Sequence, residues 1–124
     1  MDTNSWQIQL RKGAAELVVL ALLARGERYG LQLHEDAAAA GPLLSEGALY
    51  PLLNRLERER KLASRWVHEE GASHPRKYYR LTATGKRLLD EMRDTWIIFR
   101  TTMSTIVENS NVNSRANRKL PAAV

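Results

Sequence analysis

The stretch Ser45–Leu62, SEGALYPLLNRLERERKL, predicts the helix around which the fold is built. Its leucines recur at positions i, i+3, i+4 and i+7, which places them on one side of an α-helix. Ser45 precedes them as an N-cap, because its side-chain oxygen can accept from the free amides of the first turn. The side that we assign to the core consists of Leu49, Leu52, Leu53 and Leu56.

The opposite side of this helix has an unusual composition. Glycine and proline both lower helix stability, so an ordinary solvated surface rarely contains both. Small or flat residues followed by an amide and guanidinium groups suit contact with a flat, anionic partner. The alternative is a surface helix with a proline kink. This outer side carries Gly47, Pro51, Asn54 and Arg58, with Tyr50 and Arg55 on its flanks.

Two further helices are expected before this one. Residues 5–24 have apolar side chains around most of the helix circumference in their second half, which predicts burial there. Gly26 ends that helix, and Tyr29–Ala40 forms the next one. Three short helices separated by turns, the third with a polar outer side, are typical of a helix-turn-helix domain.

Two strand patterns follow the third helix, and they predict a β-hairpin. Leu62–Val67 and Arg76–Leu81 flank a segment rich in turn residues. Alternation predicts Tyr79 and Leu81 on the core side, and Lys77 near the hairpin tip with its ammonium reaching outward. A hairpin directly after a helix-turn-helix is a wing; the alternative is a solvated basic strand. The fold class is therefore mainly α with a small two-stranded β-hairpin, a winged helix-turn-helix domain followed by a long helix.

That long helix, from Thr82 as N-cap to about Glu108, predicts self-association. Its apolar residues are spaced alternately three and four apart, as in a coiled-coil seam. A domain of this size has no spare surface to cover the seam, so we expect a homodimer; the alternative is an intramolecular hairpin with the first helix. The expected dimer residues are Trp6, Leu10, Leu89, Met92, Trp96, Phe99, Met103 and Ile106.

Composition limits the remaining classes. The chain has 124 residues, a formal net charge of +5 and no cysteine, which favours an anionic partner and excludes disulfides and thiolate metal sites. No segment predicts a membrane span or a signal peptide, and we expect a cytoplasmic protein. The three histidines lack metal-ligand spacing, and no catalytic constellation is present, so we predict neither a metal, a cofactor nor an enzyme. We expect residues 1–82 to form the DNA-binding domain, 83–108 the dimerisation helix and 109–124 a disordered basic tail.

The motifs LYPLLxRLE at Leu49–Glu57 and RKYYxLTxxG at Arg76–Gly85, with Trp66 between them, resemble those of the PadR family of bacterial transcriptional regulators. Arg28-Tyr-Gly30 fits the same resemblance, which covers roughly residues 10 to 108. The single C-terminal helix resembles the shorter PadR subfamily. Arg60-Lys61 departs from the family pattern, which usually has a glycine closing the helix.

Contacts with DNA can be assigned residue by residue. Ser45 and Tyr50 can donate to phosphate, Gly47 and Pro51 permit close approach, and Asn54 and Arg55 suit base edges. Arg58 suits a phosphate, and the wing residues His74, Arg76 and Lys77 suit the phosphate backbone or the minor groove. The family resemblance adds Tyr29 as a phosphate contact. The predicted function is a transcriptional repressor that binds double-stranded DNA, a pseudo-palindromic operator, as a homodimer. The alternatives are a winged-helix module that binds proteins, or a DNA-binding protein without an effector.

The resemblance also implies an effector site on the last helix. In some short PadR-like regulators, aromatic residues there line a pore between subunits that takes up flat, apolar compounds. Trp96 with Met92, Phe99 and Met103 would suit such a small aromatic ligand. The alternative for Trp96 is a large aromatic side chain used only as dimer core.

Overall fold

The computed structural model describes residues 3–41 and 43–109. The predicted tail lies outside the described residues apart from Asn109. The chain divides into two compact units, one up to Asp90 and one from Glu91 onward. The elements are α1 (Asn4–Leu23), β1 (Arg28–Tyr29), α2 (Gly30–Ala40), α3 (Glu46–Arg58), β2 (Leu62–Val67), β3 (Arg76–Leu81) and α4 (Ala83–Met103), which continues as a π-helical turn (Ser104–Glu108).

The α3 helix confirms the leucine pattern. Leu49, Leu53 and Leu56 have no exposed surface, and Leu52 is half-buried. Ser45 caps the helix, because its Oγ accepts from the Ala48 amide at 3.2 Å. The N-terminal turn and the buried side of α3 are therefore fixed by residues that the sequence identified.

The sheet has three strands, whereas the sequence predicted two. Its order is β1-β3-β2, and both pairs are antiparallel. The added strand, β1, is only Arg28–Tyr29, which is too short to produce an alternating pattern. It pairs with Tyr78 and Tyr79 of β3. The wing is thus attached along one edge to the segment that leads into α2.

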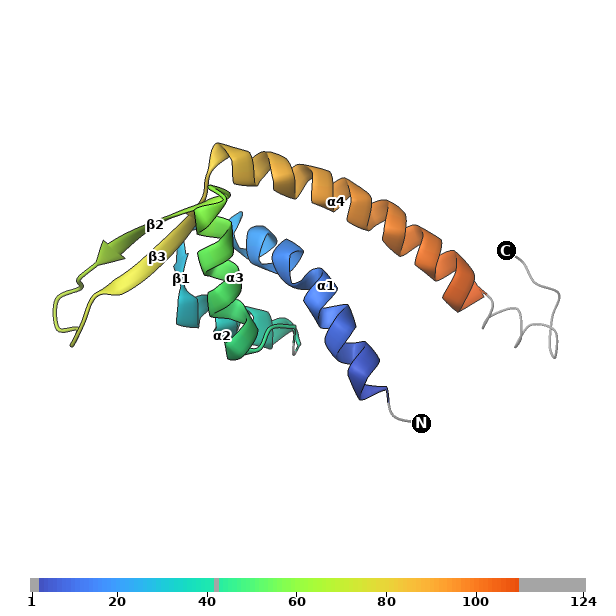
Figure 1. Ribbon diagram of the computed structural model, residues 1–124, viewed down its shortest axis with the longest axis horizontal. Coiled ribbons are helices and arrows are strands. Elements are labelled where there is room, and N and C mark those ends of the chain that lie inside the picture. The colour runs from blue at the N-terminus through green and yellow to red at the C-terminus, as the bar shows by residue number, and fades with distance from the viewer. Residues whose placement is uncertain (1–2, 42, 110–124) are drawn as a thin grey trace. The chain divides into compact units, whose positions relative to one another are not determined.

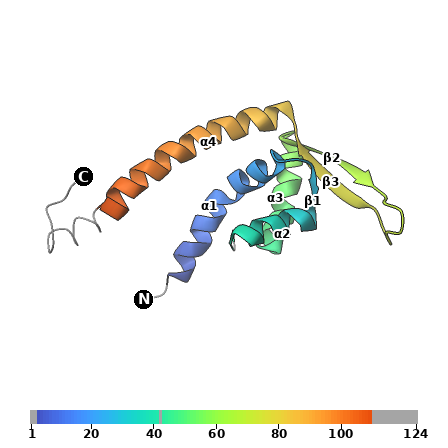
Figure 2. The same ribbon diagram turned by 180° about the vertical axis from the view of Figure 1, so that it is seen from behind.

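In both views of the chain the β2–β3 hairpin projects away from α1, α2 and α3 (Figures 1 and 2). Tyr79 and Leu81 of β3 are buried, as the alternation predicted. The core beneath them includes Val19 and Leu20 from α1 and Leu33 from α2, all without exposed surface. Among residues 3–41 and 43–109, no helix is both long and apolar enough to cross a lipid bilayer.

In the turn from α3 into β2, Arg60 occupies the position where the family pattern usually has a glycine. Arg60 has φ of +63°, in the left-handed region that favours glycine. The Arg60 amide donates to the Glu57 carbonyl at 3.0 Å, and the Lys61 amide donates to the Leu56 carbonyl at 2.9 Å. These two bonds form a Schellman motif. The turn is thus a glycine-type helix end built with arginine.

The first turns of α4 belong to the winged-helix unit. Thr82 caps the helix, because its Oγ1 accepts from the Gly85 amide at 3.0 Å and donates to the Arg60 carbonyl at 2.6 Å. Leu89 is only 3% exposed within the single chain. Its assignment to the dimer seam was therefore wrong. Leu89 fits the three-and-four spacing of the seam, but its side chain is buried within its own domain.

Candidate nucleic-acid interface

The outer side of α3 is exposed, as its composition predicted. Gly47, Tyr50, Pro51, Asn54 and Arg58 all lie in the exposed class, along a single side of the helix. Arg58 forms no ion pair with another residue in the described part of the chain, so its guanidinium is available to an external anion. Although the Ser45 hydroxyl accepts the capping bond, its hydrogen can still be donated to a ligand.

Tyr50 lies against Gly30 at the start of α2. A Cβ added to Gly30 would be 2.6 Å from Tyr50 Cε1, so only glycine leaves room for the ring in this position. Tyr29, the residue before Gly30, is the N-cap of α2. The structure thereby gathers Tyr29, Tyr50 and the free amides of the α2 N-terminus, a combination of donors that suits phosphate.

Arg55 differs from the other assigned residues, because acids already hold its guanidinium. Its Nη2 is 2.7 Å from Glu16 Oε1 of α1, and its Nη1 is 3.2 Å from Glu59 Oε1. Lys61 joins the same cluster, with its Nζ 2.9 Å from Glu59 Oε1. Arg55 therefore links α3 to α1: its guanidinium contacts two carboxylates, whereas the sequence suggested a contact with base edges.

On the wing, Arg76 lies over an aromatic pair. Its guanidinium carbon is 4.6 Å from the centroid of the Tyr29 ring, and Tyr29 meets Tyr78 edge-on at 5.3 Å. Glu69 accepts from the Tyr78 hydroxyl at 2.8 Å and lies 3.7 Å from Arg76. Arg76 remains exposed, so its cation is oriented by these contacts and still accessible.

Lys77 turns toward α3 instead of reaching out from the hairpin tip. Its Nζ is 3.0 Å from Glu57 Oε1 and lies over the rings of Trp66 and Tyr79, at 5.8 and 5.5 Å. The hydrogen bond to Glu57 raises the pKa of Lys77. The hydroxyl of Ser64 and then Lys77 hold the pKa of Glu57 below its ordinary value. Lys77 is thus a fixed cation, half-buried at the junction of α3 and the wing.

His74 lies in the turn between β2 and β3 and is exposed. Its Nδ1 is 3.0 Å from the Ser73 hydroxyl, which leaves Nε2 on the outer side of this contact. Two exposed surfaces of one compact unit, the outer side of α3 and the cationic wing, thus carry most of the predicted residues, whereas Tyr29, Arg55 and Lys77 are half-buried. Helix-turn-helix proteins with this pair of elements bind duplex DNA through both.

Comparison with known proteins agrees with this geometry. The model of the transcriptional regulator PadR-like family matches residues 19–91. The chain belongs to the PadR-like family. A transcriptional regulator of Mycobacterium tuberculosis is 33% identical over 85 residues, which is 68% of this chain and 78% of that protein. This PadR-like chain is a member of a family of transcriptional regulators.

Solved structures show the same fold. The PadR family transcriptional regulator of Eggerthella lenta superposes with a TM-score of 0.74 at 37% identity, over 86% of this chain and 92% of that one. A PadR-like transcriptional regulator of Bacillus cereus superposes with a TM-score of 0.72 at 30% identity, over 80% and 96%. The helices and the small three-stranded sheet of this PadR-like chain are those of winged-helix regulators.

Two residues that support the interface escaped the sequence analysis. Gly30 makes room for Tyr50, and Glu57 holds Lys77. The Arg28-Tyr-Gly30 motif was a signal for the first, although it did not say what the glycine would face. Glu57 is the last residue of the LYPLLxRLE motif, but the motif did not indicate its partner, because Lys77 lies in a strand that local patterns cannot align with the helix.

In the second unit of this PadR-like protein, the C-terminal part of α4 exposes apolar side chains. Trp96, Phe99, Met103 and Ile106 are 44%, 51%, 40% and 60% exposed, and Met92 is half-buried. The rings of Trp96 and Phe99 are 6.3 Å apart. Such a run of exposed apolar side chains on one helix is typical of an association surface.

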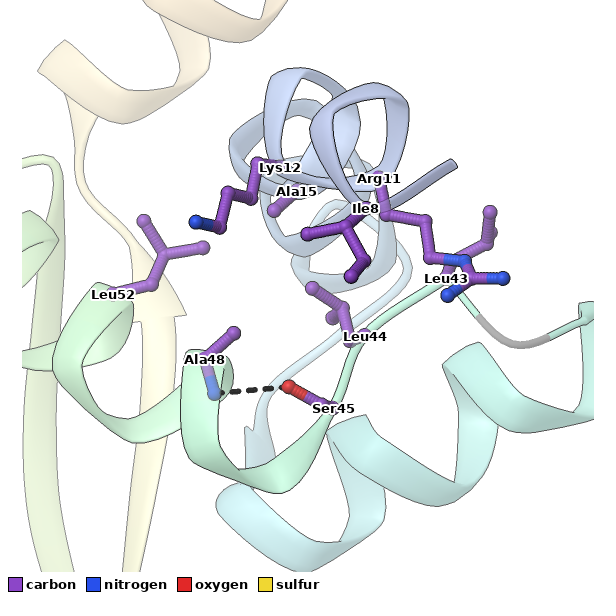
Figure 3. Close-up of a pocket in the computed structure, with 9 residues that line it drawn as sticks. All are labelled: Ile8, Arg11, Lys12, Ala15, Leu43, Leu44, Ser45, Ala48 and Leu52. Carbon is purple, nitrogen blue, oxygen red and sulfur yellow. Dashed lines mark hydrogen bonds between the residues drawn. The ribbon is translucent and has the colours of Figure 1, made fainter. Parts of the chain in front are cut away.

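In the first unit, the N-terminal half of α1 is also apolar and exposed, with Trp6 at 60% and Leu10 at 54%. The other side of α1 borders a groove of about 560 Å³ between α1, the segment that precedes α3, and α3 itself (Figure 3). Ile8 and Ala15 of α1 and Leu44 and Leu52 from the other side point into it. At 100° per residue, Trp6 and Leu10 lie on the opposite side of α1 from Ile8, so the groove and the exposed side around Trp6 are separate surfaces.

Proposed function

We propose that this PadR-like protein is a sequence-specific transcriptional repressor that binds a pseudo-palindromic operator as a homodimer. The observation that carries the proposal is the pairing of an exposed α3 outer side with a cationic wing in one compact unit. Winged-helix proteins place such a helix in the major groove and the hairpin against the backbone or minor groove.

The contacts divide by chemistry. Asn54 can pair with adenine in the major groove, and Gly47 and Pro51 allow the α3 backbone to approach closely. Phosphates accept hydrogen bonds from Tyr29, Ser45, Tyr50 and Arg58. The DNA backbone beside the wing is contacted by His74, Arg76 and Lys77. We assign Arg55 a different role, because it bonds two carboxylates, those of Glu16 and Glu59, and so sets the position of α3 on α1. Lys77 has a single carboxylate partner, Glu57, and its ammonium keeps further N–H donors for a phosphate.

The exposed apolar surfaces support the homodimer. A second copy would cover Met92, Trp96, Phe99 and Met103 of α4, Ile106 of the π-helical turn that follows it, and Trp6 and Leu10 of α1. Two-fold symmetry would then present two α3 helices to half-sites about 34 Å apart, one turn of DNA. Sedimentation of the purified protein at micromolar concentration tests this assembly, with a single subunit as the contradicting result.

Selection of bound fragments from a genomic library tests the DNA function. Purified protein should enrich fragments that share an inverted repeat, with half-site centres 10 to 11 base pairs apart, as expected for one turn. Enrichment without any shared sequence would contradict sequence-specific repression. A duplex-binding repressor acts where the chromosome is, so we place the protein in the cytoplasm, and we propose that it acts by binding and not by catalysis.

The exposed pair of Trp96 and Phe99 favours a small aromatic effector. We propose that flat, apolar compounds bind beside Trp96, with Met92 and Met103 as adaptable neighbours, and thereby release the operator. A planar cationic dye should quench tryptophan emission, and this quenching should be lost in Trp96→Ala. Because Trp6 and Trp66 also emit, unchanged quenching in that variant would remove Trp96 from the effector site.

A further inference from the structure

Trp66 is an exposed tryptophan to which the contacts assigned so far give no role. It leaves 68% of its surface exposed on β2. Exposing so large an apolar ring is unfavourable in an isolated domain, since covering apolar surface is the main driving force of folding and association. The ring of Trp66 is thus accessible to a partner, and its surroundings on the wing indicate which kind of partner it suits.

The register of the sheet defines which side of the wing carries Trp66. It pairs with Lys77, while Ser64 on the same strand pairs with Tyr79. Directly paired residues of antiparallel strands lie on the same side of the sheet, and so do residues two apart. Trp66 therefore shares the α3-facing side with the buried Tyr79, but lies closer to the hairpin tip, where the ring is exposed.

A cation is fixed beside this ring. Lys77 Nζ is 5.8 Å from the centroid of Trp66 and 3.0 Å from Glu57 Oε1. The side of the wing toward α3 thus presents an apolar ring next to an ammonium whose position is set by Glu57. The nucleic-acid backbone offers the complementary pair, an apolar deoxyribose next to an anionic phosphate.

We propose that Trp66 is a further DNA-contact residue, whose ring packs against a deoxyribose while Lys77 meets the adjoining phosphate. The indole N–H is an additional donor that the same phosphate can accept from. This inference rests on the proposed function and adds to it a contact that does not depend on base sequence. It also explains why Lys77 is held facing α3: it lies where the ring and the cation act together.

The test compares wild type, Trp66→Ala and Trp66→Phe on two labelled duplexes, one recovered by selection and one of mixed sequence at low salt. Fluorescence anisotropy measures affinity. If DNA covers about half of the exposed ring, the apolar area removed from water corresponds to a change in affinity of roughly tenfold. Trp66→Ala should therefore weaken binding to both duplexes about tenfold. Trp66→Phe should retain most of the affinity, because a flat apolar ring remains. Thermal unfolding should be nearly unchanged in both variants, since the ring is exposed.

Tryptophan emission gives a second readout with unlabelled DNA. DNA should shift the emission of the wild type, and most of that shift should be absent from Trp66→Ala, which still contains Trp6 and Trp96. If wild type binds but Trp66→Ala matches it in affinity and emission shift, this inference is wrong and the proposed function stands. The inference is also wrong if Trp66→Ala loses affinity only for the selected duplex. It is equally wrong if Trp66→Ala changes the sedimentation of the protein but not its affinity for DNA. If wild type binds no duplex at all, the proposed function itself fails.

Discussion

Glu57 of α3 and Lys77 of β3 form an ion pair in which Oε1 and Nζ are 3.0 Å apart. The Ser64 hydroxyl of β2 donates to the same carboxylate. One side chain at the C-terminal end of α3 therefore connects to both strands of the wing. This carboxylate is one of the contacts that hold the proposed reading helix against the wing, and both must be held in place to contact DNA together.

Replacing Glu57 with glutamine should lower the free energy of unfolding at neutral pH by about 1–2 kcal/mol, because a charge-assisted bond to a half-buried lysine is lost. The pKa of Glu57 is lowered in the folded state. Its stabilisation is therefore present above the ordinary value of 4.5 and is lost as pH falls through the lower, folded value. Urea titrations at several pH values should show that the free energies of unfolding of wild type and Glu57→Gln become equal in acid. A difference in stability that does not shrink as the pH falls below 4.5 would contradict this assignment.

Gly85→Ala should destabilise the winged-helix unit by about 1–3 kcal/mol, because overpacking against backbone has no inexpensive relief. An added Cβ would lie 2.1 Å from the Lys61 carbonyl oxygen. Gly13→Ala is the matched control: it is also in a helix, but its Cβ would meet nothing within 4 Å. That variant should gain about 0.5–1 kcal/mol from helix propensity. Equal changes in the two melting temperatures would show that the contact at Gly85 is unimportant.

Arg60→Gly should stabilise the protein by about 0.5–1 kcal/mol, because relief of the left-handed backbone exceeds the entropy that glycine adds to the unfolded chain. The side chain of Arg60 is exposed and φ is +63°. Arg60→Ala keeps the strain and should show no such gain. Chemical denaturation of the three proteins decides the matter, and a loss of stability in Arg60→Gly would contradict the backbone explanation.

Asn54→Ala and Arg58→Ala should weaken DNA binding in different ways. Arg58 suits phosphate, so its loss should weaken binding to all duplexes alike and reduce the salt slope by about 1. Asn54 suits a base edge, so its loss should cost about 1–3 kcal/mol on the selected duplex and little on mixed sequence. Anisotropy titrations over a range of salt concentrations separate the two. Identical behaviour of both variants would mean that these roles are misassigned.

Local patterns predicted most of the fold. The leucines of α3, the Ser45 and Thr82 caps, and both strands of the hairpin follow from spacing and side-chain chemistry, and each is present at the expected residues. The third strand was missed because two residues cannot show a period. Leu89 fits the seam spacing of α4 but is buried in its own domain, since spacing does not reveal where a domain boundary cuts a helix.

The direction of side chains at the candidate interface was less predictable where ion pairs between distant parts of the chain determine it. Arg55 lies beside the outer side of α3, but Glu16, which is 39 residues earlier in the chain, holds its guanidinium. Lys77 was expected to reach outward, and Glu57 holds it inward. Neither acid is a local neighbour on the same face. The identity of the exposed side of α3 could thus be derived from sequence, whereas the direction of individual cations could not.

The ratio of two dissociation constants tests the central claim most directly. One constant is for a duplex recovered by selection, and the other is for the same duplex with the base sequence of its half-sites scrambled. Both are measured by fluorescence anisotropy at physiological salt. A sequence-specific repressor should bind the selected duplex about a thousandfold or more tightly than the scrambled one. Equal affinity for the two would contradict the account, because the outer side of α3 would then not distinguish one base sequence from another.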